Sequence, residues 1–105
     1  MANILLIESR DGFEAREGGF GCALAQALAR HGNAVTVFMV QNGVLSARAG
    51  AQAPQLAALR DAGVELLADS FSLRERGIGL TSGVTPGELD IVIDRMAEGW
   101  QVIFH

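Results

Sequence analysis

Short apolar runs that alternate with helical segments constrain the fold of this chain more than any other feature. Ile4–Ile7 is a continuous apolar run, which is typical of a strand buried on both faces. Further strands are predicted at 34–40, 64–68, 78–84 and 100–104, and helices at 22–30, 55–62 and 71–76. This order predicts an α/β fold, a three-layer α/β/α sandwich around a mostly parallel sheet of four or five strands.

The clearest helix signal lies near the end of the sequence. Thr85 and Glu88 have the spacing of a capping box, with Pro86 at the first helical position. Apolar side chains then recur at i, i+3, i+4 and i+7, at Leu89, Val92, Ile93 and Met96. The pattern predicts an amphipathic helix that ends at Gly99, followed by the last strand.

The length of 105 residues predicts a single domain over 1–105. All eight basic residues are Arg, so a Schiff-base lysine and the lysine of a phosphate-binding P-loop are excluded. One Cys excludes an internal disulfide and a cysteine-rich zinc site. Neither His31 nor His105 indicates a catalytic triad or a metal site. We therefore expect no metal and no cofactor.

Charge and hydropathy narrow the set of partners. The formal net charge of −4 argues against nucleic acid as a partner, because phosphate binding favours a basic surface. The first residues have no basic region before their apolar run, and no apolar stretch approaches the ~20 residues of a membrane span. We expect a cytoplasmic protein that binds neither DNA nor membranes. Its half-apolar composition, with Trp100 at the core rim or in an interface, favours oligomerisation.

Ligands of open α/β sheets bind beyond the carboxyl ends of the strands. The segments that follow three of the predicted strands meet at that edge, and they predict a pocket formed by Glu8, Asn42, Gly43, Asp69, Ser70, Ser72 and Arg76. For Asp69 a structural role is the alternative, since Asp followed by Ser70 and Ser72 is also typical of a helix N-cap.

Two further features carry possible chemistry. Gly18–Gly21 precedes a predicted helix and, with Arg10 or Arg16, could hold a small anion or a nucleotide; a flexible entry turn is the alternative. Cys22 is expected in the first turn of that helix, where a thiol is more readily a reactive thiolate. The alternative for Cys22 is a small buried residue among alanines.

Three stretches together resemble the DsrE/DsrF-like family of small sulfur-relay proteins. They are LAQALARHGNAVTVFMVQNGV (24–44), LRDAGVELLADSFSLRERGI (59–78) and GVTPGELDIVIDRMAEGWQVIFH (83–105). The resemblance covers most of the chain and implies a cytoplasmic α/β/α protein. It also implies homo-oligomers, commonly trimers or hexamers, or hetero-oligomers with related subunits, and a partner protein in a sulfur relay.

The resemblance further implies a persulfide-carrying Cys after the third strand, before Arg76-Gly77. This sequence departs there, because Asp69 or Ser72 stands at that place and neither side chain can hold a persulfide. Three hypotheses follow. The chain is a binding or assembly subunit, a sulfur carrier that uses Cys22, or a binder of small anions or nucleotides. Whether it is an enzyme stays open.

Overall fold

The structure, a computed structural model, describes residues 2–9, 18–48 and 53–105. Its elements in chain order are β1 (Asn3–Glu8), α1 (Gly18–Arg30), β2 (Ala34–Met39), the 3₁₀ helix η1 (Gln41–Ala47), α2 (Ala53–Asp61), β3 (Glu65–Asp69), α3 (Ser70–Arg76), β4 (Thr85–Gly87), α4 (Asp90–Ala97) and β5 (Gln101–Phe104). Within these ranges, none of the helices is both long and apolar enough to cross a membrane.

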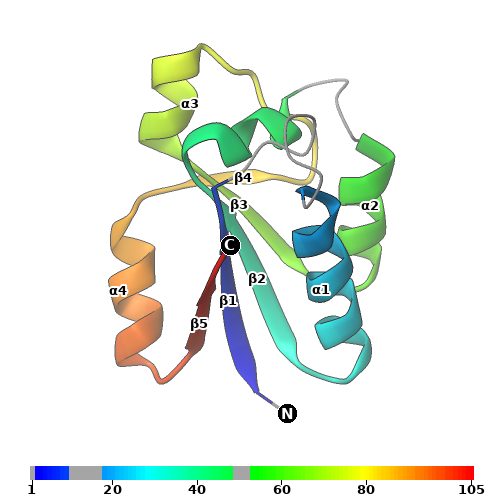
Figure 1. The fold of residues 1–105 in the computed structure, drawn as a ribbon. Helices are drawn as coiled ribbons and strands as arrows, with labels where there is room; N and C mark the ends of the chain where they lie inside the picture. Colours follow the sequence, from blue (N-terminus) through cyan, green and yellow to red (C-terminus); the bar gives the residue numbers. More distant parts are fainter. Residues whose placement is uncertain (1, 10–17, 49–52) are drawn as a thin grey trace.

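The five strands form one sheet in the order β4-β3-β2-β1-β5, and every neighbouring pair is parallel. Strand β1 lies between β2 and β5, with Leu6 level with Val37 and Ile103. Apolar side chains fill both faces of the inner strands, which is why continuous apolar runs mark them in the sequence. The predicted α/β sandwich with a parallel sheet is confirmed (Figure 1).

Two hydrophobic clusters cover the two faces of the sheet. On one face α1 and α2 pack through residues such as Ala25 and Leu56 onto Leu6 and its neighbours. On the other face Ile91 and Val92 of α4 approach Leu5, Ile7 and Phe38. Figure 1 shows α1 and α2 on one side of the sheet and α4 on the other. On this second face the eight-residue helix α4 covers only part of the sheet, so apolar side chains of β5 such as Val102 and Phe104 stay exposed to solvent.

The fourth strand and the start of the last helix differ from the prediction. Only Leu80 within 78–84 forms a bridge, to Arg48, whereas Thr85–Gly87, predicted as a capping box, forms β4 and pairs with β3. Helix α4 begins at Asp90 without a side-chain cap. The free edge of β3 draws this segment into the sheet, and Pro86 is tolerated because β4 is an edge strand.

Helix α1 begins earlier than the sequence indicates. Gly18–Gly21 forms its first turn rather than a preceding loop, so the expected first-turn position of Cys22 is wrong and Cys22 is the fifth residue of the helix. Glycine is a poor helix former, so helix propensity does not predict this earlier start. The field of a helix terminus acts mainly over its first turn, so the basis for an activated Cys22 is weakened.

Candidate functional site

A cavity of about 390 Å³ opens at the carboxyl edge of the sheet, on the α4 face. The described residues that line it lie at the ends of β1, β2, β3 and β5, at the start of η1, in α3 and at the start of α4. They are Ile7, Val40, Gln41, Asp69, Phe71, Ser72, Glu75, Leu89, Val92 and Phe104. This is the edge at which ligands of open α/β sheets bind. The lining is mostly apolar with a few polar groups, as is usual for small-molecule sites.

Asp69 is the polar centre of the cavity wall. It ends β3, is 3% exposed, and its Oδ2 accepts hydrogen bonds from the backbone N–H of Ser72 (3.0 Å) and from the Ser72 hydroxyl (2.7 Å). The expected N-cap of α3 is therefore present, with Asp69 as the cap residue. The cap uses one carboxylate oxygen only.

The other oxygen of Asp69 has no such role. Oδ1 is buried and has no hydrogen-bond partner among the described residues. Leaving a buried polar atom without a partner costs about 1–3 kcal/mol, and more for a charged group. Capping and ligand binding are thus not exclusive alternatives for Asp69, since Oδ2 caps the helix and Oδ1 is left without a partner among the described residues.

Ser72 links the cavity wall to the end of β2. Its hydroxyl accepts a hydrogen bond from the backbone N–H of Gln41 (2.9 Å) while it donates to Asp69. Gln41 has a φ of 50°, which an L residue rarely adopts, and it begins η1. The Ser72 hydrogen bond helps to hold this strained turn in place, so the geometry of the cavity depends on Ser72.

The other residues of the predicted pocket lie nearby but form separate pairs. Arg76 donates from Nη2 (3.1 Å) and Nε (3.3 Å) to Oδ1 of Asn42, and thereby connects α3 to η1. The Ser70 hydroxyl donates to the carbonyl of Gly87 in β4 (3.2 Å). None of these three side chains is among the described residues that line the cavity. Their contacts hold together the elements that surround it.

Glu8 and Gly43 belong to a second cluster, at the ends of β1 and β5. Oε2 of Glu8 lies 2.7 Å from Nδ1 of His105, and the His105 backbone N–H donates to Ile7 (2.9 Å). A Cβ at Gly43 would lie deep inside the contact distance of the Glu8 carbonyl oxygen, so only glycine fits there. Sequence reasoning assigned no role to His105, because its partner is distant in the chain.

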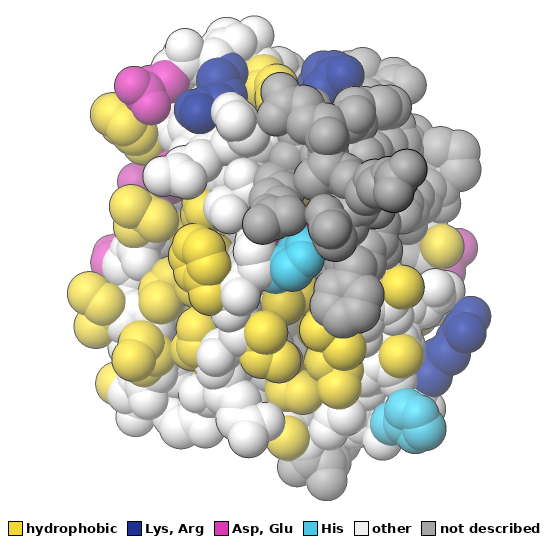
Figure 2. Space-filling view, viewed as in Figure 1, with side chains coloured by type: hydrophobic (Ala, Val, Ile, Leu, Met, Phe, Trp, Pro, Cys, Tyr) yellow, Lys and Arg dark blue, Asp and Glu magenta, His cyan; other side chains and the backbone are white. Residues whose placement is uncertain are grey.

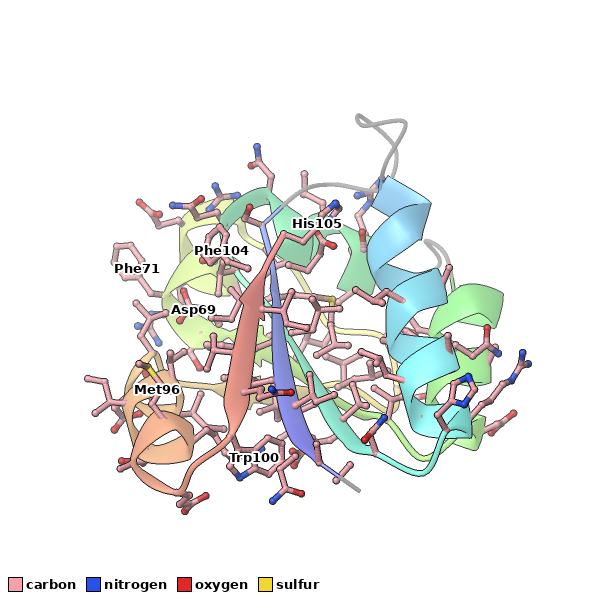
Figure 3. All side chains as sticks on the ribbon, turned by 60° about the horizontal axis from the view of Figure 1, so that its bottom comes forward. Asp69, Phe71, Met96, Trp100, Phe104 and His105 are labelled. Atoms are coloured by element: carbon pink, nitrogen blue, oxygen red, sulfur yellow. The ribbon has the colours of Figure 1, made fainter. Side chains whose placement is uncertain are left out.

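The apolar wall of the cavity was missed from the sequence. Phe71, Leu89 and Phe104 line it, together with the turn residue Gln41. Figure 3 shows Asp69, Phe71 and Phe104 near one another, with Trp100 at the opposite end of β5 from His105. The sequence did offer one indication of this wall, because Phe104 ends the last predicted strand and therefore lies at the carboxyl edge of the sheet, where the pocket was expected.

The cavity opens into a larger apolar surface. Six large apolar side chains of α3, of α4 with the residue before it, and of β5 are exposed: Phe71, Leu89, Ile93, Met96, Val102 and Phe104. We call these six residues the apolar face. Ile93 and Phe104 are each 69% exposed. Figure 2 shows hydrophobic side chains gathered on the side of the molecule where α4 and β5 lie. Helix α4 thus packs the partly buried Ile91 and Val92 against the sheet, whereas its other apolar side chains, Ile93 and Met96, are exposed.

Some predicted residues lie outside the parts that can be described. Arg10 and Arg16 fall outside the described residues, as does the side chain of Cys22. Among the described residues, no three His, Cys, Asp or Glu side chains are grouped to hold a metal ion. The reactivity of the Cys22 thiol and the anion binding by Arg10 or Arg16 therefore remain predictions from the sequence.

The chain is similar to known proteins over nearly its whole length. The family model described as "DsrE/DsrF-like family" matches residues 3–104. The ychN protein from E. coli aligns over 100% of both chains with a TM-score of 0.89 at 17% identity. MTH1491, a protein of unknown function from Methanobacterium thermoautotrophicum, also aligns over 100% of both chains, with a TM-score of 0.82 at 18% identity.

BT1422, a conserved protein of unknown function from Bacteroides thetaiotaomicron, aligns over 97% of this chain and 94% of its own, with a TM-score of 0.75 at 14% identity. No match is found among curated proteins. At these identities the solved structures show a shared fold. Together with the family model, which spans nearly all of the sequence, this establishes that the chain belongs to the DsrE/DsrF-like family.

Proposed function

We propose that this protein is a cytoplasmic binding and assembly subunit linked to sulfur relay, and that it carries no sulfur at the position of the family's cysteine. One observation carries the proposal. Asp69 and Ser72, which stand at that position by resemblance, are buried, hydrogen-bonded to each other and part of a cavity wall. A carboxylate and a hydroxyl cannot form a persulfide. Their arrangement is suited to holding a ligand.

Mass spectrometry after exposure to a persulfide donor tests this proposal. The intact protein is expected to gain no sulfur under conditions in which a carrier with a family cysteine is loaded. Cys22→Ser is the matched variant, because Cys22 is the one thiol of the chain. Sulfur gained by the wild type and absent from Cys22→Ser would instead establish the alternative, a carrier with its thiol on α1.

The assembly role rests on the apolar face. Monomers rarely expose contiguous apolar patches of more than a few hundred Å², and larger patches mark interaction sites. Here six large apolar side chains lie on adjacent elements, and β5 is an edge strand beside them. We propose that copies of this chain, or related subunits, cover the part of this face around Ile93 and Met96 in a trimer or hexamer. Burial of Ile93 alone contributes about 2 kcal/mol.

Size-exclusion chromatography with light scattering tests the assembly. Wild-type protein is expected at a multiple of the 11.1 kDa chain mass, and Ile93→Glu at or near the mass of one chain, because a carboxylate at the interface is desolvated without a partner. Ala58→Glu is the control, since Ala58 is exposed on α2 across the sheet. A wild-type mass of 11.1 kDa, or equal masses for Ile93→Glu and the wild type, would refute the assembly role.

A further inference from the structure

We infer that the cavity takes a small organic cation with an apolar body, such as a primary amine in its ammonium form. The inference rests on the proposed function in one respect, namely that this cavity binds a ligand. It adds the chemical class of that ligand. Three features of the described lining support it: its charge, the unpartnered oxygen of Asp69, and the aromatic rings at its mouth.

The charge of the lining favours a cation. Among the described residues that line the cavity, Asp69 and Glu75 are acidic and none is basic. Arg76 of α3 is not among the lining residues; it donates to Asn42 and lies 3.7 Å from Glu75. An anion in the cavity would face the buried carboxylate of Asp69, where charges are poorly screened, and the half-exposed carboxylate of Glu75, where solvent screens them more. A cation is attracted there.

Asp69 supplies the hydrogen-bond acceptor that would recognise the charged group of the ligand. Its Oδ2 is used by Ser72, whereas the buried Oδ1 has no hydrogen-bond donor among the described residues. A ligand that brings a donor group supplies the missing partner once the atoms that bury this oxygen shift to admit it. A charged donor also compensates the buried charge, and charge-assisted hydrogen bonds are about twice as strong as neutral ones. An ammonium group meets both needs.

The mouth of the cavity supplies the apolar and aromatic contacts. Phe71 and Phe104 line it from α3 and β5, and both rings are mostly exposed. Aromatic faces attract organic cations, and this is how ammonium ligands are recognised in aromatic cages. Ile7, Val40 and Val92 form apolar wall behind the rings. The ligand therefore joins a cationic head to an apolar body of modest size, within a cavity of about 390 Å³.

Nuclear magnetic resonance titration with three probes of similar shape tests the inference. Benzylammonium, benzyl alcohol and phenylacetate share an aromatic ring and differ in charge. The backbone amides of Gln41 and Ser72 report on the site, since they lie at the Asp69 wall. We expect benzylammonium to shift both amides and to bind at least about tenfold more tightly than phenylacetate, a difference of ~1.4 kcal/mol. Benzyl alcohol is expected between the two.

Paired variants separate the site from the general charge of the protein. Asp69→Asn is expected to abolish the preference for benzylammonium, whereas Asp61→Asn, which removes an exposed carboxylate on α2, retains it. Should Asp69→Asn fail to fold, Glu75→Gln is the second variant, with a smaller loss of about twofold to threefold, because Glu75 is half exposed and screened. An unchanged preference in the variant used would overturn the inference.

The outcomes also distinguish this inference from the proposed function. Phenylacetate binding as tightly as benzylammonium, with shifts at Gln41 and Ser72, would overturn the cationic class and leave the cavity as a binding site. Shifts by none of the three probes at either amide would overturn both the inference and the binding role.

Discussion

Replacement of Ser72 by alanine removes two hydrogen bonds from the junction of β2, β3 and α3. The hydroxyl donates to Oδ2 of Asp69 at 2.7 Å and accepts from the Gln41 N–H at 2.9 Å, while the Ser72 backbone bond to Asp69 stays. A hydrogen bond to a charged group contributes about 1.5–3 kcal/mol, and a neutral one about 1 kcal/mol. Water partly replaces the bond at the exposed Gln41, so the expected loss is about 2–3 kcal/mol.

Urea unfolding followed by circular dichroism measures this loss, at one protomer concentration for all variants because assembly couples to stability. Ser70→Ala is the matched control. Its hydroxyl makes one neutral hydrogen bond, 3.2 Å to Gly87, so it is expected to lose about 1 kcal/mol or less. A loss for Ser72→Ala no larger than that for Ser70→Ala would refute the role assigned to Ser72 as the link between the cavity wall and η1.

Two other substitutions test the surrounding framework. Gly43→Ala is expected to destabilise the protein by about 3 kcal/mol or more in urea unfolding, because its Cβ overlaps the carbonyl of Glu8, whereas Gly79→Ala, with open space around it, changes stability by less than about 1 kcal/mol. Equal effects would contradict the close approach. Arg95→Ala is expected to cost about 2 kcal/mol by thermal unfolding, because the guanidinium donates to the buried Thr36 hydroxyl (2.9 Å). A loss below about 0.5 kcal/mol, the usual range for surface substitutions, would mean that this contact is dispensable.

The inner strands could be predicted because burial on both faces requires continuous apolar runs. Ile4–Ile7 has such a run, and it lies within β1 as expected. The three-residue β4 has no such signal. Its sequence satisfies the local rules of a helix cap, and only the available edge of β3 decides that it is extended. Local rules cannot decide between two structures when the deciding contact is distant in sequence.

The candidate site could be predicted in its location but not in its detail. The carboxyl-edge rule placed Asp69 and Ser72 together, and both line the cavity. The pairing of Glu8 with His105 joins residues at opposite ends of the chain, so no spacing predicts it. Periodicity likewise predicts the apolar stripe of α4, but it does not say that Ile93 and Met96 face away from the core.

Native mass spectrometry after incubation with a persulfide donor tests the central claim most directly, because one spectrum reports both assembly and sulfur content. A binding and assembly subunit predicts a mass that is a whole multiple of the 11.1 kDa chain, with no sulfur added. A single-chain mass would contradict the assembly of subunits through the apolar face. An added sulfur that is lost in Cys22→Ser would contradict the binding role and identify a carrier.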